Sequence, residues 1–104
     1  MDFDLGYEHY ARSFRWAPDR EPNPQYDGIP DEPFAGLIID HPRHDNGEPC
    51  SGVVTFDTPV TARVFPNKPR WEIVNHDPLT LSPSIACSCG DHGFIQDGKW
   101  VNGN

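Results

Sequence analysis

The stretch SIACSCGDHGFIQDGKWV, residues 84–101, decides how this chain is expected to fold. Asp97-Gly98 is the strongest short signal for a β-hairpin, because a type I′ turn requires positive φ at both central positions. We therefore expect residues 94–101 to form two antiparallel strands joined by a tight turn. Gly90 directly follows Cys89, and a glycine there can adopt positive φ and let the chain turn sharply. The stretch is thus predicted to be a cysteine-bearing turn followed by a hairpin.

Cys87, Cys89 and His92 have spacings that suit a metal ion. In an extended backbone, Cys87 and Cys89 place both sulfurs on one side, and a turn after Cys89 can bring His92 to the same ion. Zinc takes four thiolate or imidazole ligands in a tetrahedron, and a closed set of four is typical of structural sites. The predicted ligands are Cys50, Cys87, Cys89 and His92.

Two histidines in DHPRHD, His41 and His44, compete for a place in this site. His44 is the better alternative fourth ligand, because it lies six residues before Cys50 and can share its loop. Otherwise the two histidines belong to a solvated polar loop, and the cysteines are free buried thiols. A cysteine nucleophile assisted by His92 and Asp91 is also conceivable, although only their adjacency in sequence supports it.

Short β-branched segments precede this stretch and predict further strands. They are GLIID (36–40), GVVTF (52–56), VTARVF (60–65) and RWEIV (70–74), separated by segments rich in Pro, Asn, Asp and Gly. The pattern predicts a mostly β chain, in which a small antiparallel sheet domain over residues 35–104 is stapled by one zinc. Zinc would add folding free energy to a core that is thin at this chain length.

Residues 1–34 are predicted to be an irregular, aromatic and Pro-rich arm. Five prolines between Pro18 and Pro33 exclude a helix or a central strand there. Before them, Tyr7, Tyr10 and Phe14 are spaced three and four apart, which predicts one short helix with an aromatic face. Such an arm either packs on the domain or docks on a partner.

Composition excludes several classes of function. The 104 residues suit one domain, and a formal charge of −8 argues against a non-specific nucleic-acid binder and against an anionic membrane surface as partner. The sequence shows no apolar run long enough for a membrane span and no secretory signal. Three cysteines without such a signal indicate metal ligands in a reducing cytoplasm rather than disulfides.

The last half of the chain resembles a family of small uncharacterised bacterial and phage proteins with a C-terminal pattern Leu-Thr-x-x-Pro-Ser-Ile, Cys, His and Ile-x-x-Gly-x-Val. The matching residues are Leu79, Thr80, Pro83, Ser84, Ile85, Cys89, His92, Ile95, Gly98 and Val101, with Cys50 and Trp71 upstream. The resemblance implies a zinc-binding β domain without an assigned reaction, in a version similar to those of actinobacterial phages. Some bacterial members lie beside ubiquitin-like conjugation components. Family members commonly carry two or more upstream cysteines, so His44 or Cys87 must complete the ligand set around Cys50.

These features predict a non-enzymatic zinc-binding protein, encoded by a phage, that acts in the host cytoplasm through contacts with an unidentified protein partner. Two alternatives stay open. One is a zinc- or cysteine-dependent hydrolase, and the other is a virion accessory protein of the capsid or tail. The sequence leaves the oligomeric state open.

Overall fold

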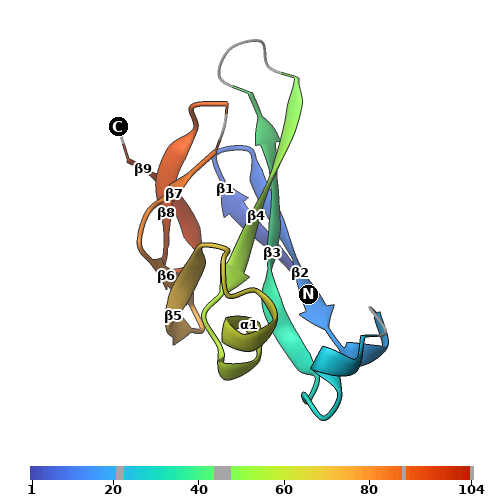
Figure 1. Ribbon diagram of the computed structural model, residues 1–104. Coiled ribbons are helices and arrows are strands. Elements are labelled where there is room, and N and C mark those ends of the chain that lie inside the picture. The colour runs from blue at the N-terminus through green and yellow to red at the C-terminus, as the bar shows by residue number, and fades with distance from the viewer. Residues whose placement is uncertain (21–22, 44–47, 88, 104) are drawn as a thin grey trace.

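The computed structural model describes residues 1–20, 23–43, 48–87 and 89–103 and is mostly β, as the sequence predicts (Figure 1). Two short 3-10 turns, at Pro18–Arg20 and Pro24–Tyr26, connect the second and third strands. The remaining elements are β1 (Asp2–Gly6), β2 (His9–Trp16), β3 (Glu32–Pro42), β4 (Pro49–Phe56), α1 (Pro59–Val64), β5 (Arg70–His76), β6 (Leu79–Ser82), β7 (Ile85–Ala86), β8 (His92–Gln96) and β9 (Lys99–Asn102).

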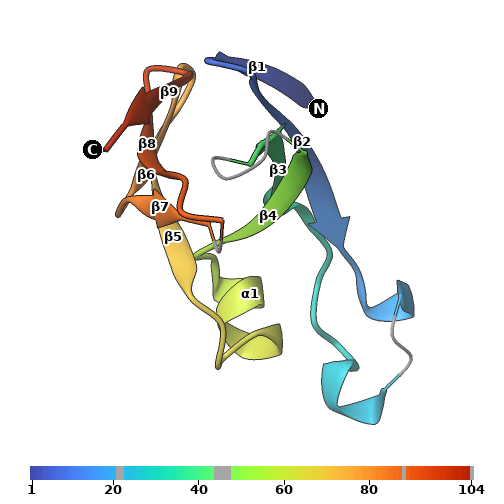
Figure 2. The ribbon, with the colours of Figure 1, turned by 90° about the horizontal axis from the view of Figure 1, so that it is seen from above.

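The strands form a six-stranded sheet in the order β1-β2-β3-β4-β5-β6 and a three-stranded sheet in the order β7-β8-β9. All pairs are antiparallel except β4 with β5, which is parallel because α1 crosses between them. The large sheet curves until β1 comes round beside β9 (Figure 2). There the Lys99 ammonium group donates a hydrogen bond to the carbonyl oxygen of Asp4, at 3.4 Å.

The main core fills the space inside this curve. Alternate residues of a strand share a face, so Leu37 and Ile39 of β3 point inward together with Val54 and Phe56 of β4. All four side chains are at most 1% exposed. Residues of the small sheet pack on the same cluster, which joins the two sheets into one hydrophobic core. This packing fixes how β3 and β4 lie against the small sheet.

The N-terminal third differs from the expected irregular arm with a short helix. Residues 2–16 form the β1–β2 hairpin, whose turn holds Tyr7 and Glu8 at positive φ, 52° and 62°. Burial in β2 alternates, with His9 and Ala11 buried and Tyr10 exposed, so the period is two. The helix prediction was wrong, because the spacing of the aromatic residues hid this alternation in a segment rich in β-forming residues.

The strand predicted at residues 60–65 was also wrong, because α1 occupies this place. Thr58 caps the helix: its hydroxyl accepts from the backbone N–H of Thr61, whose hydroxyl in turn accepts from the N–H of Thr58. Pro59 fits the first helical turn, where its missing N–H costs nothing. In contrast, the hairpin predicted at Asp97-Gly98 is confirmed, with φ of 51° and 76° at the turn that joins β8 to β9.

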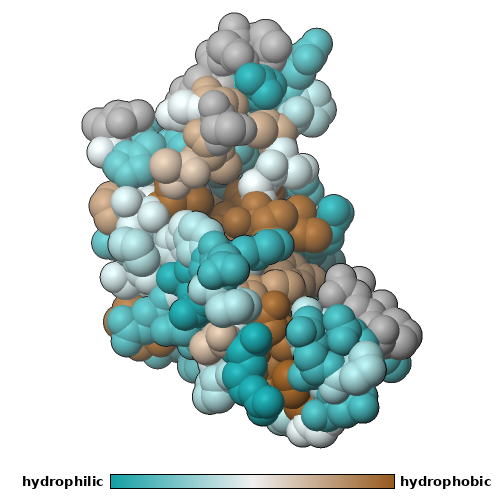
Figure 3. Space-filling view, in the orientation of Figure 1, coloured by the Kyte–Doolittle hydropathy of each residue, from teal (hydrophilic) through white to brown (hydrophobic). Residues whose placement is uncertain are grey.

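The face in Figure 3 carries a hydrophobic band across the middle of β4. Val53 of β4 is 61% exposed and lies directly across from the half-buried Ile38 of β3. Single exposed apolar residues of this kind are normal on protein surfaces.

In the described part of the chain, no helix has the length and apolar character needed to cross a bilayer.

Candidate functional site

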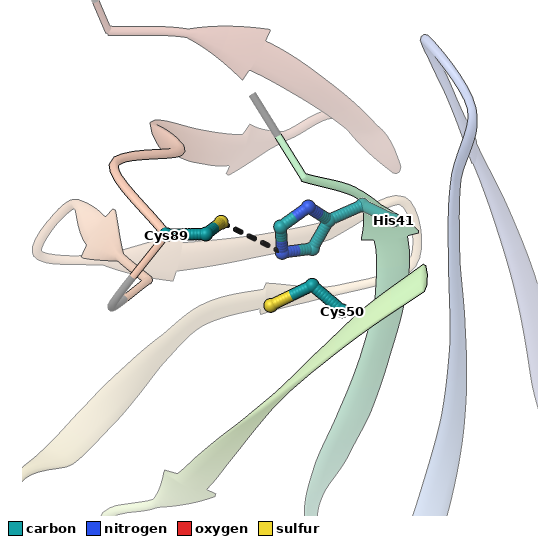
Figure 4. A group of neighbouring side chains, drawn as sticks. All are labelled: His41, Cys50 and Cys89. Carbon is teal, nitrogen blue, oxygen red and sulfur yellow. Dashed lines mark hydrogen bonds between the residues drawn. The ribbon is translucent and has the colours of Figure 1, made fainter. Parts of the chain in front are cut away.

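Side chains from β3, β4 and the turn between β7 and β8 converge where β3 ends and β4 begins. His41 of β3 and Cys50 of β4 are directly opposed in the ladder, so their side chains share the inner face of the sheet. Cys89, in the turn between β7 and β8, points toward the same place (Figure 4). One ligand atom from each of these three residues lies within 4.8 Å of the others, so the group could hold a metal ion.

Cys87 adjoins this group through His41, although it is not one of the residues whose ligand atoms all lie within 4.8 Å of one another. Its Sγ lies 3.3 Å from His41 Nε2, while Cys89 Sγ lies 4.0 Å from the same nitrogen. The imidazole nitrogen is therefore the common neighbour of the sulfurs of Cys87 and Cys89. We refer to His41, Cys50, Cys87 and Cys89 as the Cys/His cluster.

Two backbone hydrogen bonds of Cys87 hold the turn in a shape that directs both sulfurs toward His41. The N–H of Cys87 donates to the carbonyl oxygen of Asp91 at 2.8 Å, and the N–H of Gly90 donates to that of Cys87 at 3.0 Å. Gly90 has φ of 95°, as expected for a glycine that closes this turn. On the opposite wall, a Cβ added to Gly52 would lie only 2.9 Å from Cys87 Sγ. The lack of a side chain at Gly52 therefore leaves room for the sulfur of Cys87.

The orientation of His41 leaves one ring nitrogen directed at the sulfurs. Its Nδ1 lies 2.9 Å from the carbonyl oxygen of Pro42 and 3.5 Å from Asp91 Oδ2. Both oxygens are acceptors, so Nδ1 carries the proton and Nε2 presents its lone pair to the cluster. Metal-binding histidines are commonly oriented in this way, with the second nitrogen donating to a carbonyl or a carboxylate.

Asp91 is itself held by a second buried histidine. His9 Nε2 of β2 lies 2.5 Å from Asp91 Oδ2, and both side chains are under 10% exposed. His9, His41 and Asp91 also bring ligand atoms within 4.8 Å of one another. His9 is hydrogen-bonded to Asp91, and Asp91 Oδ2 lies 3.5 Å from His41 Nδ1, so these three residues form a chain of contacts that leads outward from the Cys/His cluster.

Burial, followed in decreasing order by the negative charges of Cys89, Asp91 and Cys50, raises the pKa of the Cys87 thiol to about 11. The cause is that a thiolate here would lose water and face other anions. A bound cation would reverse this preference, because a coordinating thiol is deprotonated by the ion. The electrostatics of the cluster therefore suit a cation.

The structure places the three predicted cysteines around one histidine, but this histidine is His41 and not the predicted His92. Cys87 and His92 both stand outside the two groups of potential ligands found among the described residues. Cys87 Sγ nevertheless lies 3.3 Å from His41 Nε2, whereas the neighbour of the His92 ring is that of Phe94, at 6.1 Å. His44, the alternative ligand, lies outside the described residues. Sequence reasoning also missed His9, which has no local signal. Asp91 was noticed only for its adjacency to the cysteines.

Ser84 and His92 share the outer face of the small sheet. Ala86 of β7 is directly opposed to His92 of β8, while Ile85 is opposed to Gly93 and is buried at 3% exposure. Alternation along the extended chain places Ser84 on the outer face with Ala86, and therefore with His92. Among the described residues no hydrogen bond joins the two side chains, whose positions correspond to diagonal neighbours of a ladder, about 7–8 Å apart. The backbone carbonyl of Ser84 accepts from Trp71 Nε1 at 3.1 Å.

The fold and this cluster define a small β domain with a Cys/His centre that could hold a metal ion. The chain belongs to the BubE family, described as bacterial ubiquitination-like system serine protease, whose family model matches residues 49–102. The match spans β4 to β9 and includes all three cysteines, Ser84 and His92, whereas His41 lies before it. No curated protein and no solved structure matches the chain.

The match confirms that the last half of the chain resembles a small bacterial domain. It also corrects the predicted function. The expectation of a non-enzymatic phage protein acting through protein contacts was wrong, because the family is one of bacterial proteases. The alternative of a hydrolase agrees with this family in its class of reaction, but the family description names serine and not zinc or cysteine.

Proposed function

We propose that this chain is a serine peptidase with Ser84 as nucleophile and His92 as general base, braced by a structural zinc in the Cys/His cluster. The observation that carries the proposal is the placement of Ser84, one residue before β7, and His92 of β8 toward the outer face of the small sheet, on either side of the cysteine turn. Membership of a serine protease family supports it. A nucleophilic serine requires a base that can reach its hydroxyl, and apo enzymes often show this contact longer than in the substrate complex.

The other described serines have partners that do not activate a nucleophile. The hydroxyl of Ser51 donates to Asp40 at 2.5 Å on the far face of β4, and that of Ser13 accepts from the N-terminal amino group at 3.1 Å. Ser82 lies across from Glu72 in the β5–β6 ladder. Ser88 lies outside the described residues and is the rival nucleophile.

The proposed reaction is acyl transfer. His92 takes the proton from the Ser84 hydroxyl as its oxygen attacks the scissile carbonyl carbon, and the tetrahedral intermediate then expels the amine. The protonated His92 gives its proton to that leaving amine, which produces an acyl-serine. Water, deprotonated by the same imidazole, hydrolyses the ester and regenerates the serine. No other co-reactant is required.

The Cys/His cluster suits zinc. A tetrahedral ion with bonds of about 2.3 Å to sulfur and about 2.05 Å to nitrogen sets those two ligand atoms about 3.6 Å apart. The distances from His41 Nε2 to the sulfurs of Cys87 and Cys89, 3.3 and 4.0 Å, bracket this value. Three thiolates and one imidazole close the coordination shell, so zinc would act as a brace and not as the Lewis acid.

The brace would act directly on the catalytic pair. Ser84 precedes Cys87 by three residues, and His92 follows Cys89 by three. Fixing the two sulfurs on one ion would hold the β7–β8 register, and with it the diagonal relation between serine and histidine. A misplacement of about 1 Å at a catalytic group can reduce the rate about 100-fold, so such bracing has catalytic value.

The substrate we propose is a ubiquitin-like protein or one of its conjugates, since the family description refers to a bacterial ubiquitination-like system. The outer face of the small sheet offers apolar surface beside the catalytic pair. Phe94 and Val101 are directly opposed there, and Val101 is 40% exposed. An extended peptide segment could lie along these side chains while its carbonyl group meets Ser84.

A fluorophosphonate probe tests this assignment without a known substrate, because it reacts with activated serines. We expect mass spectrometry to find the label on Ser84, and we expect both Ser84→Ala and His92→Ala to abolish labelling while zinc content is kept. Ser51→Ala and Ser82→Ala are the matched controls and should label like the wild type. A label on Ser88, or a His92→Ala variant that labels normally, would overturn the assignment.

A further inference from the structure

His9 joins the N-terminal hairpin to the Cys/His cluster. It lies at the start of β2, is 7% exposed, and contacts a carboxylate that follows it by 82 residues in the chain. The family match begins at residue 49, so neither His9 nor His41 lies in the matched segment. A buried histidine in such a position has a cost unless both ring nitrogens are satisfied.

Both nitrogens of His9 are satisfied, and this fixes the direction of the ring. Nδ1 lies 2.7 Å from the carbonyl oxygen of Tyr7 and Nε2 lies 2.5 Å from Asp91 Oδ2; both oxygens are acceptors, so each of these hydrogen bonds takes an N–H from the ring. The ring is stacked on Trp100 at 4.3 Å between centroids and on His41 at 5.1 Å, with interplanar angles of 10° and 15°. Rotation of the His9 ring would break these stacks and both hydrogen bonds.

Asp91 passes this constraint on to the cluster. Its Oδ2 atom faces His9 Nε2 on one side and His41 Nδ1, at 3.5 Å, on the other. The tyrosine carbonyl therefore orients His9, His9 orients Asp91, and Asp91 helps to orient His41. The contacts of Asp91 with His9 and His41 join side chains that are almost fully buried, where water competes little, whereas the bond to the Tyr7 carbonyl is partly buried.

We propose that His9 is a positioning residue for the metal centre, acting through Asp91 to hold His41 Nε2 toward the ion. This inference rests on the zinc site proposed above and goes beyond it, because it gives the N-terminal hairpin a role in metal affinity. The carboxylate and the hydrogen bonds around metal-binding histidines commonly tune affinity, and their loss costs about 10–100-fold.

Zinc affinity of the full chain, measured by competition with a chromophoric chelator, tests the proposal. His9→Phe keeps an aromatic ring between Trp100 and His41 but removes the hydrogen bond to Asp91. We expect it to weaken zinc binding by about 10–100-fold. His9→Gln retains an amide donor for Asp91 and should recover part of this loss. His76→Phe, at an exposed histidine of β5, is the matched control and should bind zinc like the wild type.

The double variant separates positioning from a general structural role. If His9 acts through Asp91, His9→Phe should have little further effect on zinc affinity in an Asp91→Asn background. The visible spectrum of the cobalt-substituted protein should also change with His9→Phe, because it reports the ligand geometry directly. His9→Phe affinity within twofold of the wild type, or full additivity in the double variant, would overturn the proposal. A wild type that binds no zinc would overturn the proposed zinc site and this inference with it. The two outcomes named before would overturn only the role of His9, so the two failures are distinguishable.

Discussion

Replacement of Gly52 by alanine tests the metal centre with a single methyl group. The added Cβ would lie 2.9 Å from Cys87 Sγ, whereas ordinary contacts begin at 3.4 Å, so the sulfur must retreat by about 0.5 Å. Metal–ligand distances tolerate shifts of about 0.2 Å. The required movement therefore exceeds what a bound ion allows, and coordination by Cys87 must weaken.

The size of the effect follows from where the strain falls. Without metal, Cys87 can rotate its side chain away from the new methyl group, so the metal-free protein should lose little stability. With metal the sulfur is fixed, and overpacking of this kind costs about 1–3 kcal/mol. At about 1.4 kcal/mol per tenfold change, we expect Gly52→Ala to weaken zinc binding by roughly 5–150-fold.

Chelator competition measures this affinity, and thermal unfolding of the metal-free protein checks that the fold is kept. Ser51→Ala is the matched control. This substitution adds no volume, and residue 51 faces Asp40 on the side of β4 that points away from the cluster. Its zinc affinity should equal that of the wild type. If Gly52→Ala binds zinc within twofold of the wild type, Cys87 is not a ligand and the reasoning fails.

Two further pairs of substitutions test other parts of the structure. His41→Ala should abolish stable zinc binding, whereas His92→Ala should keep one zinc per chain by elemental analysis; the reverse result would restore His92 as the fourth ligand. Leu5→Ala should lower the free energy of unfolding by about 2–5 kcal/mol in urea, because Leu5 of β1 is 0% exposed in the main core. Tyr7→Ala, at a residue 79% exposed in the same hairpin, should change it by about 0.5 kcal/mol or less, and a similarly small effect of Leu5→Ala would place β1 outside the core.

The parts of the fold that depend on local signals were predictable from the sequence. Asp97-Gly98 determines its own turn, and the strands around 36–40, 52–56 and 70–74 have the β-branched composition that strands require. The β1–β2 hairpin was missed because its turn uses Tyr7 and Glu8 at positive φ, where Gly, Asn or Asp would have been the usual signal. The cap formed by Thr58 and Thr61 was overlooked because their hydroxyl groups sit in a β-branched run.

The ligand set shows a different limit. The cysteines were predictable as ligands because Cys87 and Cys89 are close in sequence and zinc requires four ligands, which points to Cys50 as a further one. The choice between His41 and His44 depends on the register of β3 against β4, which sets His41 directly opposite Cys50. That register results from the packing of the inward-facing residues of both strands, a non-local property. The contact of His9 with Asp91 depends on the closure of the whole curved sheet.

The order of the four cluster residues along the chain has a consequence for folding. His41 and Cys50 come together in the β3–β4 hairpin, whereas Cys87 and Cys89 follow Cys50 by 37 and 39 residues. Until that later segment has folded back onto the hairpin, the chain can offer an ion two ligands and no closed shell. We expect metal capture to follow the docking of the small sheet, so a cell short of zinc would accumulate chains whose β7–β8 hairpin is unbraced.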